Sequence, residues 1–272
     1  MKKFATIVMS LMLAIPMFCM PVEREMTFAD GYNGASLENS EFTTIPFSRE
    51  EEEEVLIKGG VPLYYDESSR TNTCANVAGA ILLGYYDKTY DELIENFSSA
   101  RVIRDKVLYA KQTEAVEAVM ERLYTTMLTN VTEGGTTIPN FKNGLKTYVN
   151  EQGRSISYTQ AVSNETIQAD ILQNSIQNER PIVLFVSKYT LISTLALDAE
   201  SGAEEFYKQR YVGNHTVVCY GMRTIRYFDA TGRQTNQLDL LLVATGYGYS
   251  STGYILIDEY GTLIDGYEVY IF

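Results

Sequence analysis

A change of hydrophobic period at Pro181 is the feature that most limits how this chain can fold. Before it, apolar residues recur at spacings of three and four, the helical period, within 71–88 and over 88–97, 112–130, 139–152 and 164–180. After it, short apolar runs separated by Gly, Ser, Thr and Asp indicate antiparallel strands at 181–187, 215–228, 238–248, 253–259 and 266–272. Helices followed by strands predict an α+β domain.

The N-terminus has the pattern of an export signal. Two lysines precede an uninterrupted apolar segment over residues 4–18, which is shorter than the roughly 20 residues that a membrane span needs. We predict a signal peptide over residues 1–22 and a secreted or cell-surface protein. No later apolar run is long enough to cross a bilayer, so we expect no stable membrane insertion after signal removal.

Residues 23–58 are polar, rich in glutamate and irregular in pattern. They include five consecutive glutamates at 50–54, a composition typical of a solvated helix face or a linker; a short prosegment that masks a site is the alternative. Gly59, Gly60 and Pro62 then punctuate the chain. We therefore place the start of the folded domain at residue 59 and its end at residue 272.

Charge and composition exclude several classes of function. The chain has 22 basic and 35 acidic residues, a net charge of −13, which repels nucleic-acid phosphates. It has a single histidine, and only Cys74 and Cys219 remain after the signal, too few for the usual zinc sites. The glycine-rich segment 244–253 lacks the Gly-Lys-Ser/Thr ending of a phosphate-binding loop, so nucleotide binding is not expected there. We expect the protein to bind no nucleic acid, metal or cofactor, and to be a monomer.

A cysteine and the sole histidine carry the candidate chemistry. Cys74 lies in the first turn of an apolar helix, where the helix dipole favours a thiolate, and His215 opens an apolar strand. A helix-borne Cys followed by a strand-borne His is the order found in acyl-transfer nucleophiles. Cys74 as a buried small hydrophobe, His215 as a strand-edge residue, and a Cys74–Cys219 disulfide remain alternatives. Cys219, four residues beyond His215, is expected in the core.

Four short segments resemble those of papain-like cysteine peptidases, nearest the bacterial branch related to double-glycine leader peptidases. "TNTCANVAGAILLGYYDK" is similar to the nucleophile helix, and "NERPIVLFV" to the Arg-Pro strand that follows it. "NHTVVCYGM" resembles the strand of the catalytic base, and "VATGYGYSSTGYILID" the segment that supplies the third catalytic residue. The segments cover roughly residues 60–272 in the family's order. The resemblance implies a papain-like fold, with a helical half carrying the nucleophile and an antiparallel sheet half.

Carried over by position, the resemblance makes Cys74 the nucleophile and His215 the general base. The family's orienting asparagine is replaced by Thr245, whose hydroxyl is expected to accept from the imidazole. Asp229 or Asp239, on the connection between strands, could serve instead.

The family's oxyanion glutamine is also missing, because Ser68 and Ser69 occupy its position. Asn72 is close enough in sequence to donate in its place, together with the backbone N–H of Cys74.

These residues predict an exported cysteine peptidase that hydrolyses peptide bonds of a peptide or protein substrate. A catalytically degenerate papain-like domain that binds peptide or a cell-surface ligand is the first alternative. A transglutaminase-like acyl transferase, with Asp229 or Asp239 as its carboxylate, is the second.

Overall fold

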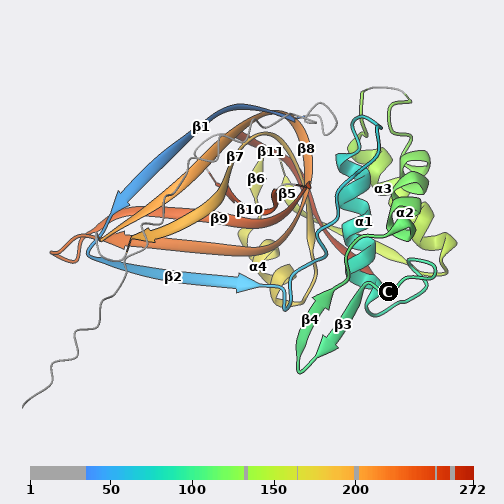
Figure 1. Ribbon diagram of the computed structural model, residues 1–272, viewed down its shortest axis with the longest axis horizontal. Coiled ribbons are helices and arrows are strands. Elements are labelled where there is room, and N and C mark those ends of the chain that lie inside the picture. Colours follow the sequence, from blue (N-terminus) through green and yellow to red (C-terminus); the bar gives the residue numbers. More distant parts are fainter. Residues whose placement is uncertain (1–34, 132–133, 164, 199–201, 249, 258–260) are drawn as a thin grey trace, which may run out of the picture.

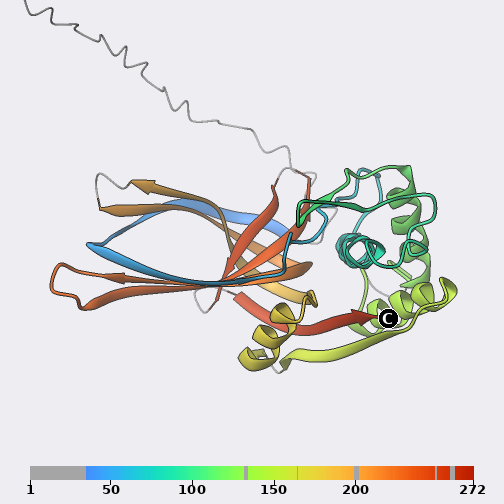
Figure 2. The same cartoon turned by 90° about the horizontal axis from the view of Figure 1, so that it is seen from below.

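The computed structural model describes residues 35–131, 134–163, 165–198, 202–248, 250–257 and 261–272. The signal peptide predicted over residues 1–22 lies outside these ranges, as does the first part of the glutamate-rich segment. Three of the four helices that the structure describes gather at one end of the molecule, and long strands extend from them toward the other end, with the fourth helix beside the strands (Figure 1). The view from below shows the same separation (Figure 2). Helices combined with an antiparallel sheet confirm the predicted α+β class.

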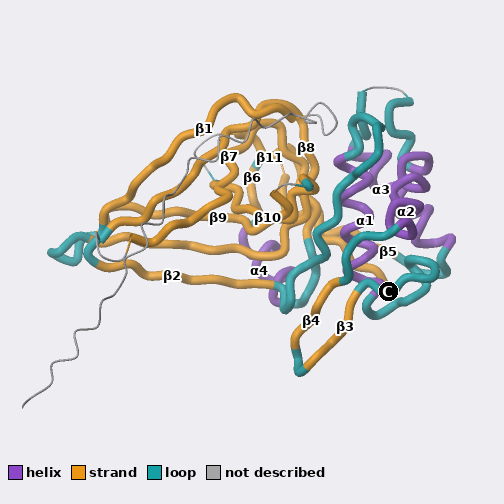
Figure 3. Tube along the Cα trace, viewed as in Figure 1, coloured by secondary structure: helices purple, strands orange, loops and turns teal. Residues whose placement is uncertain are grey.

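Helix α1 is the buried centre of the helical end (Figure 3). Every residue of α1 after Cys74 is buried, because the helix packs against α2, α3 and β8. None of the helices in the described ranges is both long and apolar enough to cross a membrane. The helices are α1 (Cys74–Asp87), α2 (Glu114–Thr126), α3 (Ile138–Glu151) and α4 (Ala169–Gln177).

Two helical predictions differ from the structure. Residues 88–97 form turns, because both carboxylate oxygens of Asp87 accept backbone N–H groups, from Ile94 and from Ser99, each at 3.0 Å. These bonds fold the chain back on the end of α1. The helix expected from residue 164 begins only at Ala169, because Thr166 and Ile167 pair with the preceding strand; residue 164 itself lies outside the described ranges.

In the part of the chain that the structure describes, nine strands form one antiparallel sheet and β3 and β4 form a separate hairpin. All the apolar runs predicted as strands belong to the sheet. The strands are β1 (Ala35–Pro46), β2 (Arg49–Leu56), β3 (Ala100–Ile103), β4 (Lys106–Tyr109), β5 (Ile156–Ser163), β6 (Thr166–Ile167), β7 (Ile182–Asp198), β8 (Ala203–Phe228), β9 (Gln234–Tyr247), β10 (Ser250–Leu256) and β11 (Gly261–Ile271).

The glutamate run forms strand β2, so its interpretation as a helix face or linker is wrong. Residues 49–56 pair antiparallel with residues 221–228 of β8. Glutamate has a low strand propensity, but here two cross-strand ion pairs, Glu52–Arg223 and Glu53–Arg226, offset part of the charge repulsion. Strand β1 pairs with the earlier part of β8, so residues on both sides of residue 59 share one sheet. The domain start at residue 59 stays a prediction.

Strands β7 and β8 are much longer than the apolar runs that identified them, and β9 begins four residues before its run. Their outer parts, together with β1 and β10, enclose a second hydrophobic core that is separate from the main one. Buried members of this core come from each of these strands: Ile45, Ile192, Phe206, Ile225, Tyr227, Leu238, Leu240 and Leu256. The main core lies between α1 and the inner parts of β7, β8 and β9, next to the candidate site.

Candidate active site

Cys74 is the first residue of α1. It is half-buried, whereas the rest of the helix is fully buried, so α1 presents its N-terminal residue to a cavity while its body fixes the backbone. The preceding residue, Thr73, contributes the first helical carbonyl, which accepts from the N–H of Val77 at 3.0 Å. The thiol is thus placed at the positive end of a helix, as the sequence predicts.

The sulfur of Cys74 is surrounded by hydrogen-bonding groups. The Thr216 hydroxyl lies 3.8 Å from Sγ. Burial is the largest influence and raises the pKa of the thiol; hydrogen bonds from the Thr216 side chain and from the backbone N–H groups of Thr216, Ala75 and Cys74 oppose it. Because the net direction is upward, the resting group is a neutral thiol at pH 7 and needs a base to accept its proton.

His215 lies on β8 with its ring buried. Its Nε2 is 2.8 Å from the backbone carbonyl oxygen of Thr245 on β9. A carbonyl oxygen only accepts, so Nε2 carries the proton and, in the neutral ring, Nδ1 carries the lone pair. The hydrogen bond therefore selects the tautomer whose other nitrogen is able to accept a proton.

Thr245 accepts from the imidazole through its backbone carbonyl, whereas the sequence predicts acceptance through its hydroxyl. The Thr245 hydroxyl accepts from the backbone N–H of Tyr247 at 3.0 Å, which closes a tight turn. Gly246, between them, has φ +76°, and a Cβ there would approach Cγ1 of Val77 on α1 to 3.2 Å. Glycine therefore allows β9 to turn against α1 with the Thr245 carbonyl directed at His215.

One cavity of about 460 Å³ brings Cys74, His215 and Asn72 together. Its walls come from the segments that precede α1 and α3 and from β7, β8 and β11. Apolar side chains from Ile138, Phe185, Val186 and Ile264 contribute to it as well as polar ones. The complete lining is Asn72, Cys74, Gly134, Gly135, Thr136, Thr137, Ile138, Phe185, Val186, Asn214, His215, Thr216 and Ile264.

Asn72 is held at the cavity wall by Asn130. The Asn72 amide donates to Oδ1 of Asn130 at 2.8 Å, and the same oxygen accepts the backbone N–H of Gly135 at 2.7 Å. Asn130 in turn donates to the backbone carbonyl of Thr71 at 3.0 Å. One residue thus ties together the loops before α1 and α3. Asn72 has φ +60°, a left-handed conformation that asparagine adopts more readily than most residues.

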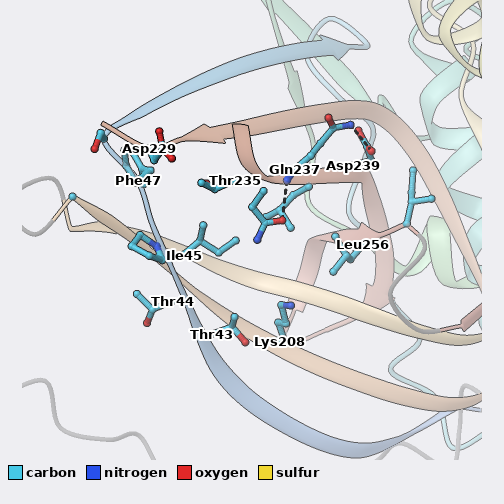
Figure 4. Close-up of a pocket in the computed structure, with 16 residues that line it drawn as sticks. Thr43, Thr44, Ile45, Phe47, Lys208, Asp229, Thr235, Gln237, Asp239 and Leu256 are labelled. Atoms are coloured by element: carbon cyan, nitrogen blue, oxygen red, sulfur yellow. Dashed lines mark hydrogen bonds between the residues drawn. The ribbon is translucent and has the colours of Figure 1, made fainter. Parts of the chain in front are cut away.

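Asp229 and Asp239 lie in a different cavity, of about 910 Å³, at the outer end of the long strands (Figure 4). Asp229 accepts the backbone N–H groups of Thr231 and Arg233 in the turn between β8 and β9. Asp239 accepts from the Thr224 hydroxyl at 2.7 Å. The structure therefore does not bring either carboxylate to His215, because Asp229 lies in the β8–β9 turn and Asp239 on the part of β9 that lines the outer cavity.

Cys219 and Cys74 are both free thiols, so the disulfide alternative is wrong. Cys219 is fully buried in the main core, as expected, and its thiol donates to the carbonyl of Gly221 at 3.3 Å. Within the described ranges, no group of three or more His, Cys, Asp or Glu side chains is placed to hold a metal ion.

Two residues of the site were missed by sequence reasoning. Thr216 directly follows His215 and could have been singled out as a hydroxyl beside the base. Strict strand alternation would have placed it on the opposite face, yet both residues reach the cavity. Asn130 lies in a loop and carries no sequence signal that points to the site.

Comparison of the sequence with protein-family models and with curated proteins gives no match.

Proposed function

We propose that the protein is an exported papain-like cysteine peptidase, with Cys74 as nucleophile and His215 as general base. The observation that carries the proposal is that both residues line one cavity, with Nε2 of His215 engaged by the Thr245 carbonyl. This leaves Nδ1 as the basic nitrogen on the ring that borders the nucleophile's cavity. Export depends on the predicted signal peptide over residues 1–22.

The reaction begins with proton transfer from Cys74 to His215. As Sγ attacks the carbonyl carbon of the peptide bond, Nδ1 takes the thiol proton and the carbonyl oxygen becomes an oxyanion. The Asn72 amide and the backbone N–H of Cys74 are the candidate donors to that oxyanion. The C–N bond then breaks, and the imidazolium returns its proton to the leaving amine. His215 next deprotonates a water molecule, which hydrolyses the thioester and regenerates the thiol.

Burial of Cys74 favours proton transfer during attack over a preformed ion pair. Because burial raises the pKa of the thiol, a thiolate in the empty cavity is disfavoured. The Thr216 hydroxyl accepts from the neutral thiol and, after a rotation of its O–H, donates to the thiolate. It therefore supports the charge that develops on sulfur.

Hydrolysis of a fluorogenic peptide library by the purified full chain tests the proposal. We expect turnover that is lost in Cys74→Ala and His215→Ala and retained in Cys219→Ala, the matched control that removes the other thiol. Cleavage that survives Cys74→Ala, or no cleavage of any library member by the wild-type protein, would contradict a peptidase.

A domain that binds peptide or a cell-surface ligand without cleaving it is the second candidate. The observation that favours it is the neutral backbone carbonyl at Nε2 of His215, which stabilises an imidazolium less than a carboxylate does. Saturable binding of uncleaved peptide, unchanged in Cys74→Ala, would support this candidate. No observation favours the transglutaminase-like alternative, because Asp229 and Asp239 line the other cavity.

A further inference from the structure

Two tyrosines from two strands stack on the imidazole of His215. The ring of Tyr247 on β9 is parallel to the imidazole within 3°, with the centroids 4.7 Å apart. The ring of Tyr189 on β7 is also stacked on it, at 5.8 Å and 17°. The hydroxyls of Tyr189 and Tyr247 are 2.5 Å apart and share a hydrogen bond. The imidazole thus lies flat against two tyrosine rings that are joined at their hydroxyl ends.

Tyr211 supports the same pair of rings. Its ring is stacked on Tyr189 at 5.0 Å and 6° and on Tyr247 at 5.6 Å and 20°. Tyr211 and His215 are four residues apart on β8, with an irregularity in the β7–β8 pairing between them, and both stack on the pair. Tyr189 is also the direct cross-strand partner of Tyr211. All four side chains are 2% exposed or less, so the stack is held by the main core.

We propose that Tyr189 and Tyr247 act as positioning residues for His215, fixing the plane of its imidazole and stabilising its protonated form. The role of the two tyrosines in catalysis rests on the proposed function, whereas their effect on the imidazole does not depend on it. Tyr211 holds the pair from the other side.

The hydrogen bond from Nε2 does not by itself fix the plane of the ring. The bond from Nε2 to the Thr245 carbonyl fixes one direction in the ring but leaves rotation about that direction open. Flat stacking on two rings removes this rotation. The faces of aromatic rings also carry negative charge density, which attracts a cation within about 6 Å of the centroid. The two tyrosines therefore supply stabilisation of an imidazolium that the neutral carbonyl provides only in part.

Among the titratable groups of the described residues, Tyr189 and Tyr247 stack on the imidazole, and Cys74 lines the same cavity. Substitution of Tyr189 separates two effects on the imidazole by their sign. Loss of the aromatic face disfavours the imidazolium and moves the titration midpoint to lower pH. Looser packing that admits water would favour the imidazolium and move the midpoint to higher pH. A merely structural role therefore predicts the opposite shift.

NMR titration of the imidazole provides the test, because His215 is the only histidine and its ring signals identify themselves. In Tyr189→Leu we expect the midpoint to fall by about one pH unit, the shift that a buried cation–ring contact produces. Tyr189→Phe keeps the ring and should leave the midpoint within about 0.3 pH units of wild type. Tyr227→Leu, the same change at a buried tyrosine of the second core, is the matched control and should not move it.

The wild-type protein provides a second readout in case Tyr189→Leu does not fold. Stacking between parallel rings places the imidazole protons over aromatic faces, so their signals should lie upfield of those in the urea-unfolded chain. An unchanged or raised midpoint in Tyr189→Leu, or imidazole signals without an upfield shift, would overturn the proposal. A lowered midpoint in a protein whose Cys74 proves unreactive would instead uphold the positioning role and reject the peptidase.

Discussion

Replacement of Thr216 by valine should slow alkylation of Cys74 without unfolding the protein. Valine has nearly the shape of threonine but lacks the hydroxyl that lies 3.8 Å from Sγ. That hydroxyl opposes the effect of burial on the thiol, so its removal raises the pKa of Cys74 further. At neutral pH a smaller fraction of the protein then carries the thiolate, which is the species that reacts.

The size of the effect follows from the contact distance. A hydrogen bond to a charged group contributes about 1.5–3 kcal/mol. A separation of 3.8 Å is long even for sulfur, so we take the lower end, and about 1.5 kcal/mol corresponds to a roughly tenfold slower reaction. The assay is the second-order rate of iodoacetamide alkylation of Cys74 at pH 7, followed by mass spectrometry. The rates of the two proteins should converge at high pH, where both thiols are ionised.

Thr190→Val is the matched control for this substitution. Thr190 is a fully buried threonine of β7 whose hydroxyl has no hydrogen-bond partner in the described part of the chain. Its replacement should leave the alkylation rate unchanged and make the protein no less stable. Equal rates for wild type and Thr216→Val at pH 7, or equal slowing by both valine substitutions, would refute the role given to the Thr216 hydroxyl.

Three further predictions concern stability. Burial raises the pKa of Cys219 and of Tyr220 to about 12, above their ordinary values of 9.0 and 10.0. As the pH rises, the unfolded chain therefore loses these two protons before the folded protein does. The free energy of unfolding that the two groups contribute is fully present below about pH 9 and falls toward pH 12. Equal urea midpoints at pH 8 and pH 11 would contradict this. Asp87→Ala should lower the free energy of unfolding by about 1–3 kcal/mol in urea titrations, because it leaves two buried backbone N–H groups without their acceptor. In Gly144→Ala the new Cβ would lie 2.6 Å from the backbone nitrogen of Met127. We therefore expect the free energy of unfolding to fall by about 1–3 kcal/mol in the same assay. An unchanged urea midpoint would show that α2 and α3 separate freely.

The inner half of the fold could be predicted from the sequence because its signals are local. The apolar spacing after Cys74 predicts a largely buried helix, and continuous apolar runs identify the inner parts of β7, β8 and β9. That Cys74 and His215 share one site could be predicted only with the help of a family resemblance. The number of residues between Cys74 and His215 carries no information about how far apart the fold places them.

The outer half could not be predicted because its order depends on partners far away in sequence. The glutamates of β2 become a strand only through pairing with β8 and with Arg223 and Arg226. At the site, Thr245 contributes a backbone carbonyl, a group that every residue has and that no sequence pattern distinguishes. The tyrosine stack likewise combines β7, β8 and β9, so its members gain meaning only when the register of three strands is known.

Covalent labelling of Cys74 by a peptidyl epoxide tests the central claim most directly, since it needs a reactive thiol, a base and a cavity that accepts peptide. We expect mass spectrometry of the folded full chain to find one adduct, on Cys74, and His215→Ala to suppress it at neutral pH while Cys219→Ala leaves it unchanged. Labelling that is absent, that falls on Cys219, or that is as fast in His215→Ala as in wild type would contradict the pairing of Cys74 with His215.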